Sequence, residues 1–323
     1  MNKLNCLFLF LLIGTLLPAQ KKALLPAVSP NGVAATHTNI AYDAHERNVF
    51  DLWLADSEEA TPLVIYIHGG GFVGGDKSRV YEYPDVDQFL AAGISFASIN
   101  YRYMTQLMDG IPGCMRDSKR AIQFIRHKAK EWNLDKERIG VYGGSAGAGT
   151  SLWLGLHDEM ADPTNEDPIL RESTRVQVIG AIATQATYDF TKWSTVLGVT
   201  YPNEEIEKAA LMQGAMALGL KSVEAMETEA GQAIRKDVDF LKLISKDDPP
   251  VFVKNEMAGD PVNVFNMDQV QHHPLHAMAL KAELDKISHE AQVYAPGLDV
   301  APADEKQLSL PEFFIKHLAD NDK

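Results

Sequence analysis

A serine within a run of small residues is the first feature of the sequence that could do chemistry. The run Gly143-Gly144-Ser145-Ala146-Gly147 follows a short apolar segment and precedes a segment of helical composition. A Gly-x-Ser-x-Gly turn between a strand and a helix holds its serine hydroxyl exposed, where the hydroxyl can attack a carbonyl carbon. The flanking glycines leave room for neighbouring chains to approach closely. We therefore predict that Ser145 is a nucleophile.

A second glycine-rich run, His68-Gly69-Gly70-Gly71-Phe72, could supply groups that stabilise negative charge. Glycines let backbone N–H groups converge on one point, where the oxyanion of a tetrahedral intermediate would form. We expect Gly70 and Gly71 to donate there, together with the N–H group of Ala146. A phosphate-binding loop is the competing interpretation, but the run lacks the Lys-Ser or Lys-Thr ending and the spacing of such loops.

The elements around these two runs alternate between short apolar strands and an amphipathic helix. Residues 63–67 are continuously apolar, as expected for a strand covered on both faces, and residues 138–142 form another strand before Ser145. Apolar residues recur at helical spacing over 117–132. This order predicts the α/β class, with a mostly parallel central sheet and helices on both faces. Further strands are expected at 49–54, 94–100, 176–183, 251–254 and 292–294, with a terminal helix at 310–318.

Residues 191–243 interrupt this alternation with a helical insertion. Met212, Met216 and Met226 lie in it among Ala and Glu residues. An insertion after the C-terminal end of a strand would lie over the site. A lid with adaptable methionine side chains and ordinary helix packing both explain this composition.

The glycine-rich runs at residues 68–72 and 143–147 resemble those of the hormone-sensitive-lipase-like branch of the α/β hydrolases, which includes bacterial carboxylesterases and polysaccharide-deacylating esterases. The resemblance extends over residues 63–253 and includes Asn100-Tyr101-Arg102, the helix that starts at Asp117, and residues 135–147. It implies an α/β-hydrolase fold and a serine carboxylesterase that cleaves short-chain acyl esters through an acyl-enzyme on Ser145, without a cofactor. Acyl groups on polysaccharides are candidate substrates. The resemblance also implies that His68 supports its loop through hydrogen bonds.

The same resemblance implies an acid after the next-to-last strand and a histidine after the last strand. Asp260, which precedes a proline, fits the acid that would orient the imidazole, with an ordinary Asp-Pro turn as the alternative. No histidine lies in residues 293–316, where the base is expected. His289 precedes the last strand and His317 lies within the final helix, so neither is placed to act on Ser145. The remaining candidates are His272, His273 and His276, and among them we predict His273.

Three alternatives follow from the unusual histidines. His272 and His276 are four residues apart and would share one helix face, so they could bind a metal ion with Asp260 or Asp268. No clear third ligand is present, and we predict neither a metal nor a cofactor. The missing histidine also leaves open a catalytically impaired homologue that binds a ligand or partner, or a weak hydrolase that relies on the oxyanion loop and water.

The N-terminal region predicts export to the periplasm or secretion. Residues 1–19 read as a signal peptide, because an apolar run at residues 6–17 follows Lys3 and is too short to span a bilayer stably. Residues 20–38 are expected to be a linker. Residues 39–323 are then one α/β domain with the helical insertion at about 191–243. Removal of Cys6 with the signal peptide would leave Cys114 alone, without a disulfide partner.

Length and charge narrow the function classes further. A chain of 323 residues with 46% hydrophobic composition can bury one large core. The formal net charge of −14 disfavours nucleic acid and acidic membrane surfaces as partners. We expect a small-molecule or polysaccharide-linked ester as the ligand, with no nucleic-acid partner and no stable membrane insertion.

Overall fold

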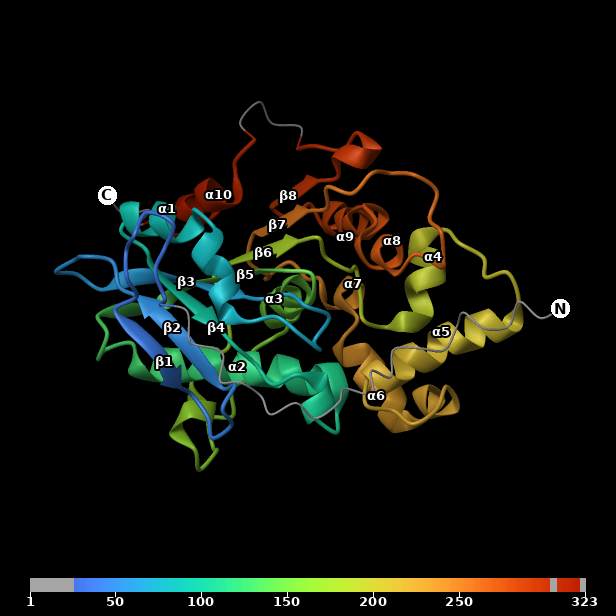
Figure 1. The fold of residues 1–323 in the computed structure, drawn as a ribbon, viewed down its shortest axis with the longest axis horizontal. Helices are drawn as coiled ribbons and strands as arrows, with labels where there is room; N and C mark the ends of the chain where they lie inside the picture. The colour runs from blue at the N-terminus through green and yellow to red at the C-terminus, as the bar shows by residue number, and fades with distance from the viewer. Residues whose placement is uncertain (1–25, 303–306, 320–323) are drawn as a thin grey trace.

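A twisted sheet forms the centre of the molecule (Figure 1). The computed structural model describes residues 26–302 and 307–319, so the predicted signal peptide lies outside the described residues. Within these ranges the sheet has eight strands in the order β1-β2-β4-β3-β5-β6-β7-β8. Strand β2 pairs antiparallel with both β1 and β4. The remaining neighbours, from β4 through β3 to β8, pair parallel. The strands are β1 (His37–Ala41), β2 (Val49–Trp53), β3 (Thr61–Ile67), β4 (Ser95–Ile99), β5 (Leu134–Gly144), β6 (Val178–Ile182), β7 (Val251–Lys254) and β8 (Ala291–Tyr294).

Strands β3 and β5 bring the two glycine-rich runs together. All residues of β3 are buried, because helices cover both faces of the sheet and β4 and β5 flank it. Ile67, the last residue of β3, pairs with Gly143 of β5. The loop that starts at His68 and the turn at Ser145 therefore leave the sheet side by side.

Helices cover both faces of the sheet, as predicted. Helices α1 (Asp85–Ala91) and α10 (Leu310–Leu318) pack on one face (Figure 1). Helices α2 (Gly110–Lys128), α3 (Ala146–Leu156) and α9 (Leu275–Lys286) pack on the other. The α/β class, with a mostly parallel sheet between two helical layers, is confirmed.

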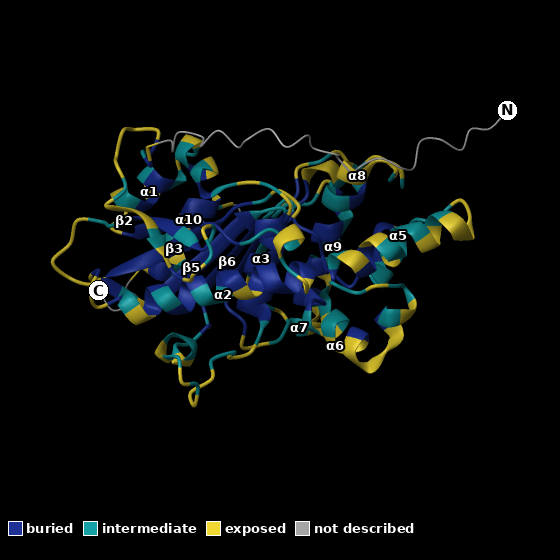
Figure 2. Cartoon of the chain, turned by 60° about the horizontal axis from the view of Figure 1, so that its bottom comes forward, coloured by how far each residue is buried: buried dark blue, intermediate teal, exposed yellow. Residues whose placement is uncertain are grey.

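The segment between β6 and β7 is the predicted helical insertion. It contains α4 (Trp193–Leu197), α5 (Glu204–Ala217), α6 (Glu229–Asp237) and α7 (Phe240–Leu243). Figure 2 shows that α5 and α6 are more exposed than the helices against the sheet. Met216 is exposed, whereas Met226 is buried.

The described part of the predicted linker packs against the domain. Val28 and Ala34 form an antiparallel bridge. The Ser29 hydroxyl donates a hydrogen bond to Asp87 of α1 at 2.5 Å. Strand β1 begins at His37, two residues before the expected domain boundary. Residues 26–38 are thus part of the packed structure.

One short helix completes the arrangement around the site. Helix α8 (Met267–His272) lies between β7 and α9 and ends immediately before His273. The Asn266 side chain caps its first turn by accepting hydrogen bonds from the N–H groups of Asp268 and Gln269. In the described part of the chain, no helix combines the length and apolar character needed to cross a membrane.

Candidate active site

Ser145 lies in a strained turn between β5 and α3. Its backbone has φ 52° and ψ −115°, a conformation that is unfavourable for a residue with a side chain and costs about 1–3 kcal/mol. A Cβ atom on Gly143 or Gly147 would overlap the carbonyl oxygen of Ile67. The two flanking positions must therefore be glycine for the turn to fit against β3.

The loop after β3 lies directly against this turn. A Cβ on Gly69 would be 2.6 Å from the Gly144 carbonyl oxygen and 3.4 Å from the Ser145 Cβ. Gly70 has φ 118°, and Gly71 has φ 59°. Among the described residues, no protein acceptor is found for the N–H groups of Gly70, Gly71 and Ala146. Free N–H groups beside a serine hydroxyl can bind the oxyanion of a tetrahedral intermediate.

His68 ties this loop to the core. Its Nδ1–H donates to the Gly69 carbonyl at 2.7 Å, and Nε2 accepts from Arg47 at 3.3 Å. The ring stacks on Tyr101, whose hydroxyl donates to the His68 carbonyl at 2.8 Å. Burial lowers the pKa of His68 to about 4, so the imidazole is neutral at pH 7. These contacts fit the supporting role expected for His68.

His272 is the histidine that contacts the serine. The Ser145 hydroxyl is 2.9 Å from His272 Nε2. His272 Nδ1 is 2.7 Å from Asp268 Oδ1, one helical turn earlier on α8. With the proton on Nδ1, that nitrogen donates to Asp268 and leaves Nε2 to accept from Ser145. A hydroxyl held by an imidazole that is itself held by a carboxylate can act as a nucleophile.

The structure does not bring the predicted Asp260 and His273 to Ser145. His273 is buried, its Nε2–H donates to the Asp260 backbone carbonyl at 2.8 Å, and its Nδ1 accepts from the Leu275 N–H group. Both ring nitrogens are therefore occupied away from the serine. The choice of His273 was wrong because α8 ends at His272, and the two adjacent side chains leave this helix end in different directions. The Asp260 carboxylate is exposed, and only its carbonyl holds a histidine.

His276 has a structural environment that does not suit a metal ligand. Its Nε2–H donates to the Val270 carbonyl at 2.9 Å, and Nδ1 accepts from the Ala186 N–H group at 3.2 Å. Burial lowers its pKa to about 4. His272 and His276 thus face different partners. Across residues 26–302 and 307–319, no group of three or more histidine, cysteine, aspartate or glutamate side chains is arranged to hold a metal ion.

A buried amide anchors the segment that carries His272, and sequence reasoning missed it. Asn255 directly follows β7 and is fully buried. Its Nδ2 donates to the carbonyl of Thr184 at 2.9 Å and to that of His272 at 3.3 Å, while Oδ1 accepts from the Thr184 N–H group at 3.0 Å. Gln185 adds a hydrogen bond to the Gln271 carbonyl at 2.8 Å. The only sequence signal was the polar residue at the end of an apolar strand.

Ser145 opens into a cavity of about 260 Å³ beneath the insertion. Helices α4 and α5 and the loop before α4 form one wall. The lining is mostly apolar, with aliphatic and aromatic side chains and glutamine as its main polar component; the aromatic and glutamine residues are Phe72, Tyr188, Phe190, Trp193, Tyr201, Gln185, Gln213 and Gln271. Met212, Met216 and Met226 do not line it, so the methionines of the insertion are not its adaptable wall.

The sequence matches a known protein family over the elements that form this site. A family model described as BD-FAE matches residues 50–272, which is more than half of the chain. The chain belongs to the BD-FAE family. The matched range begins in β2 and ends at His272, so it includes the loop after β3, the turn at Ser145 and helix α8.

Curated relatives of this BD-FAE protein carry esterase names. It is 29% identical over 158 residues to the probable carboxylic ester hydrolase LipM of Mycobacterium tuberculosis, covering 48% of this chain and 35% of the relative. It is 30% identical over 166 residues to the esterase LipQ of the same organism, covering 49% and 37%. The chain therefore spans little more than a third of the length of these relatives.

Solved structures confirm the α/β-hydrolase fold of the BD-FAE protein. A truncated carbohydrate esterase from gut microbiota has a TM-score of 0.65 at 18% identity, covering 90% of this chain and 99% of that one. An acetyl ester-xyloside bifunctional hydrolase from Caldicellulosiruptor lactoaceticus has a TM-score of 0.54 at 22% identity, covering 76% of each chain. Esterase 2 of Thermogutta terrifontis with bound propionate has a TM-score of 0.52 at 16% identity, covering 78% and 79%.

Proposed function

We propose that this protein is a serine carboxylesterase in which Ser145, His272 and Asp268 form the catalytic triad. The observation that carries the proposal is the continuous hydrogen-bonded chain from the Ser145 hydroxyl through His272 to Asp268. The proposal of an impaired homologue depended on a missing histidine, and the contact of His272 with Ser145 removes that reason. The esterase names of the relatives support the same reaction class.

The reaction follows from the positions of these groups. His272 Nε2 takes the hydroxyl proton as Ser145 Oγ forms a bond to the ester carbonyl carbon. The negative charge on the carbonyl oxygen is stabilised by the N–H groups of Gly70, Gly71 and Ala146. Collapse of this intermediate breaks the bond to the alcohol, which leaves with the proton held by His272. Water then attacks the acyl-enzyme with His272 again as base, and the acid is released.

The cavity beside Ser145 favours a planar acyl group. Aromatic side chains in its wall, including Trp193, can stack against a planar acyl group, and we propose acetyl or aromatic acyl groups as substrates. We propose that such groups are removed from polysaccharides. The carbohydrate esterase and the acetyl ester-xyloside hydrolase of similar fold support this substrate class.

Export to the periplasm or medium remains part of the proposal and rests on residues 1–19. Export would bring the enzyme to polysaccharides outside the cell. Cell fractionation followed by N-terminal sequencing tests it: a mature chain that starts near residue 20 supports export, and an unprocessed cytoplasmic chain contradicts it.

The esterase proposal is tested with p-nitrophenyl acetate at neutral to alkaline pH. We expect the wild-type protein to hydrolyse this ester and both Ser145→Ala and His272→Ala to lose at least about a thousandfold in kcat. His273→Ala is the matched control, because its ring bonds to a backbone carbonyl instead of the serine. Equal rates for wild type and Ser145→Ala would contradict the proposal, and a selective loss in His273→Ala would reassign the base.

A further inference from the structure

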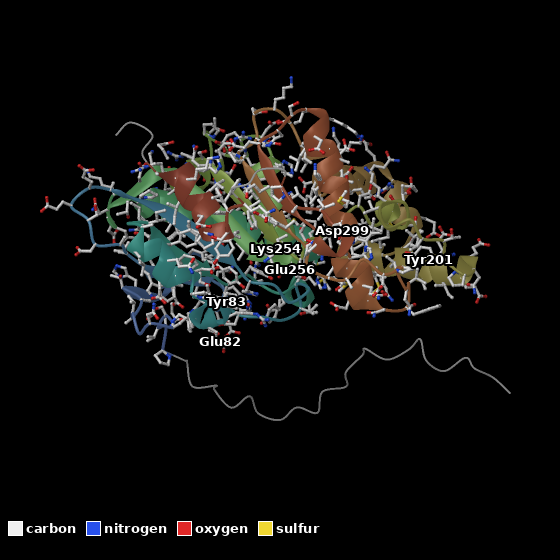
Figure 3. All side chains as sticks on the ribbon, turned by 90° about the horizontal axis from the view of Figure 1, so that it is seen from above. Glu82, Tyr83, Tyr201, Lys254, Glu256 and Asp299 are labelled. Atoms are coloured by element: carbon white, nitrogen blue, oxygen red, sulfur yellow. The ribbon has the colours of Figure 1, made fainter. Side chains whose placement is uncertain are left out.

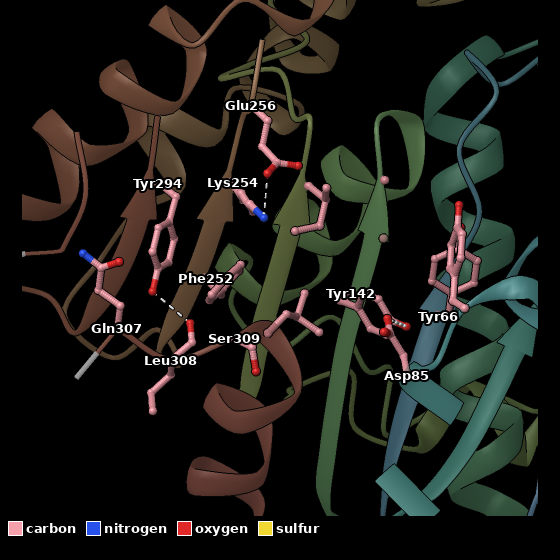
Figure 4. A pocket seen from close by; sticks show the side chains of 15 residues that line it. Tyr66, Asp85, Tyr142, Phe252, Lys254, Glu256, Tyr294, Gln307, Leu308 and Ser309 are labelled. Atoms are coloured by element: carbon pink, nitrogen blue, oxygen red, sulfur yellow. Dashed lines mark hydrogen bonds and ion pairs between the residues drawn. The ribbon is translucent and has the colours of Figure 1, made fainter. Parts of the chain in front are cut away.

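A second cavity, of about 470 Å³, is drawn in Figure 4. Its lining includes Gly143 and Gly144, which precede Ser145 in the turn. The cavity is formed at the C-terminal ends of the strands, on the face covered by α1 and α10. In Figure 3 the labelled residues Tyr83, Lys254 and Glu256 belong to its walls. The ester chemistry proposed above does not use this cavity.

The two cavities are separated by the turn that carries the nucleophile. Ser145 and Ala146 line the first cavity, and Gly143 and Gly144 line the second. The Ser145 N–H group donates to the Ile182 carbonyl at 2.8 Å, and Ile182 also lines the second cavity. The two cavities thus lie on opposite sides of the turn, and Ser145 itself lines only the first.

Aromatic faces and polar groups alternate around the second cavity. Tyr66, Tyr142, Phe252 and Tyr294 contribute rings from four strands (Figure 4). The Tyr142 hydroxyl donates to Asp85 Oδ2 at 2.7 Å, and no protein partner is found for Asp85 Oδ1 among the described residues. Burial raises the pKa of the Asp85 carboxyl. Opposite Asp85, Lys254 forms an ion pair with Glu256 at 2.8 Å.

This mixture of aromatic and polar groups favours a sugar ring over an aliphatic chain as the ligand. An aliphatic chain would cover Asp85 Oδ1 and the remaining N–H donors of Lys254 without offering them hydrogen bonds, which is costly for polar groups. A sugar ring presents C–H faces to aromatic rings and hydroxyls to carboxylates and ammonium groups. We propose that the second cavity is a separate site that binds a neutral sugar ring of a polysaccharide, a substrate class that rests on the proposed esterase function.

Glycine at position 144 keeps this cavity open. A Cβ on Gly144 would meet no atom closer than the Ile182 carbonyl oxygen, at 4.0 Å, and Gly144 does not have a positive φ. The turn itself therefore does not require glycine here, in contrast to Gly143 and Gly147. Because Gly144 lines the cavity and a Cβ there has space, we expect a larger side chain at position 144 to reduce the cavity volume.

The test measures binding of xylotriose, a neutral pyranose oligomer, in a Ser145→Ala background, so that no ester chemistry is involved. We expect saturable binding by calorimetry or ligand-observed NMR. Adding Gly144→Leu should weaken it at least about tenfold, which corresponds to about 1.4 kcal/mol. Lys254→Met should weaken it several-fold. Lys281→Met is the matched control, because Lys281 is likewise paired with one carboxylate, Asp285, but lies on α9.

The outcomes separate this inference from the esterase proposal. Loss of binding in Gly144→Leu and Lys254→Met, with binding retained in Lys281→Met, supports the sugar site even if the wild-type protein hydrolyses no ester. Absence of saturable binding to xylotriose, or equal binding by Ser145→Ala alone and with Gly144→Leu, overturns it. Binding of octanoate that is lost in Gly144→Leu would instead assign the cavity to an acyl chain. Thermal unfolding shows whether Gly144→Leu is folded. If Gly144→Leu is unfolded, the binding measured with Lys254→Met tests the proposal instead.

Discussion

His272 Nε2 lies 2.9 Å from Ser145 Oγ, although His272 precedes the last strand of the sheet. The imidazole reaches the serine from the end of α8, which begins shortly after β7. The carboxylate that holds it, Asp268, comes from the same helix, one turn earlier. The acid and the base of the proposed triad thus both lie on α8, and their position relative to Ser145 depends on the contacts that hold this helix in place.

The exposure of Asp268 predicts a modest catalytic contribution from this residue. Its side chain is 72% exposed and that of His272 is 21% exposed, so water screens their interaction. We expect Asp268→Asn to lower kcat for p-nitrophenyl acetate by about 10- to 100-fold, well below the roughly 10⁴-fold loss when a buried triad aspartate is replaced. Asp260→Asn is the control and should retain wild-type kcat. A larger loss in Asp260→Asn than in Asp268→Asn would reverse the two assignments.

Asn255 is predicted to position His272 through its backbone. Asn255→Ala removes hydrogen bonds to the Thr184 and His272 carbonyls and to the Thr184 N–H group, which leaves buried groups unpaired at a cost of about 1–3 kcal/mol. We expect a lower free energy of unfolding in urea and a reduced kcat with little change in KM. Asn263→Ala, in the exposed loop before α8, is the control. A stability loss with unchanged kcat would show that Asn255 serves folding alone.

The local motifs were readable from the sequence, whereas the placement of the base was not. The Ser145 turn and the Gly70 loop depend on neighbours in sequence, and both lie where they were predicted. The choice between His272 and His273 depends on the residue at which α8 ends and on the path of residues 255–266, which tertiary hydrogen bonds determine. Strand β1 was missed because its residues alternate too weakly to distinguish a strand from a linker. The predicted signal peptide lies outside the described residues and stays a prediction.

The buried histidines predict a loss of stability in mild acid. Burial lowers the pKa of both His68 and His276 from 6.5 to about 4, so the unfolded chain binds protons that the folded chain does not. The free energy of unfolding should therefore fall as the pH decreases from about 6.5 towards 4. Urea titrations at a series of pH values measure this slope. His276→Gln should flatten it relative to wild type, whereas His127→Gln, at an exposed site, should not; identical slopes in all three proteins would contradict the assignment to His276.

The ion pair of Lys77 and Asp51 is predicted to stabilise the segment after the oxyanion loop. Both side chains are buried, and the Asp51 carboxylate also accepts hydrogen bonds from Tyr81 and from the Asn39 N–H group. Lys77→Met would leave a buried carboxylate without its cation, at a cost of about 3–5 kcal/mol. Thermal unfolding measures the loss, and Lys316→Met, at an exposed ion pair, is the control. A change in Lys77→Met no larger than in the control would show that water already solvates Asp51.

Gly70 and Gly74 offer a matched pair within one loop for testing the oxyanion site. Gly70 has φ 118°, and a Cβ there would overlap the Gly74 carbonyl, whereas a Cβ on Gly74 would lie 3.8 Å from the nearest atom. Gly70→Ala must displace the loop and with it the N–H donors near Ser145. We expect kcat/KM for p-nitrophenyl acetate to fall by about 10²–10³-fold, and Gly74→Ala to stay within a few-fold of wild type. The same overlap costs stability, so the kinetics of Gly70→Ala are measured below its own thermal unfolding transition. If both variants lost activity equally, the rate would depend on the mobility of the whole loop and not on donors placed by Gly70.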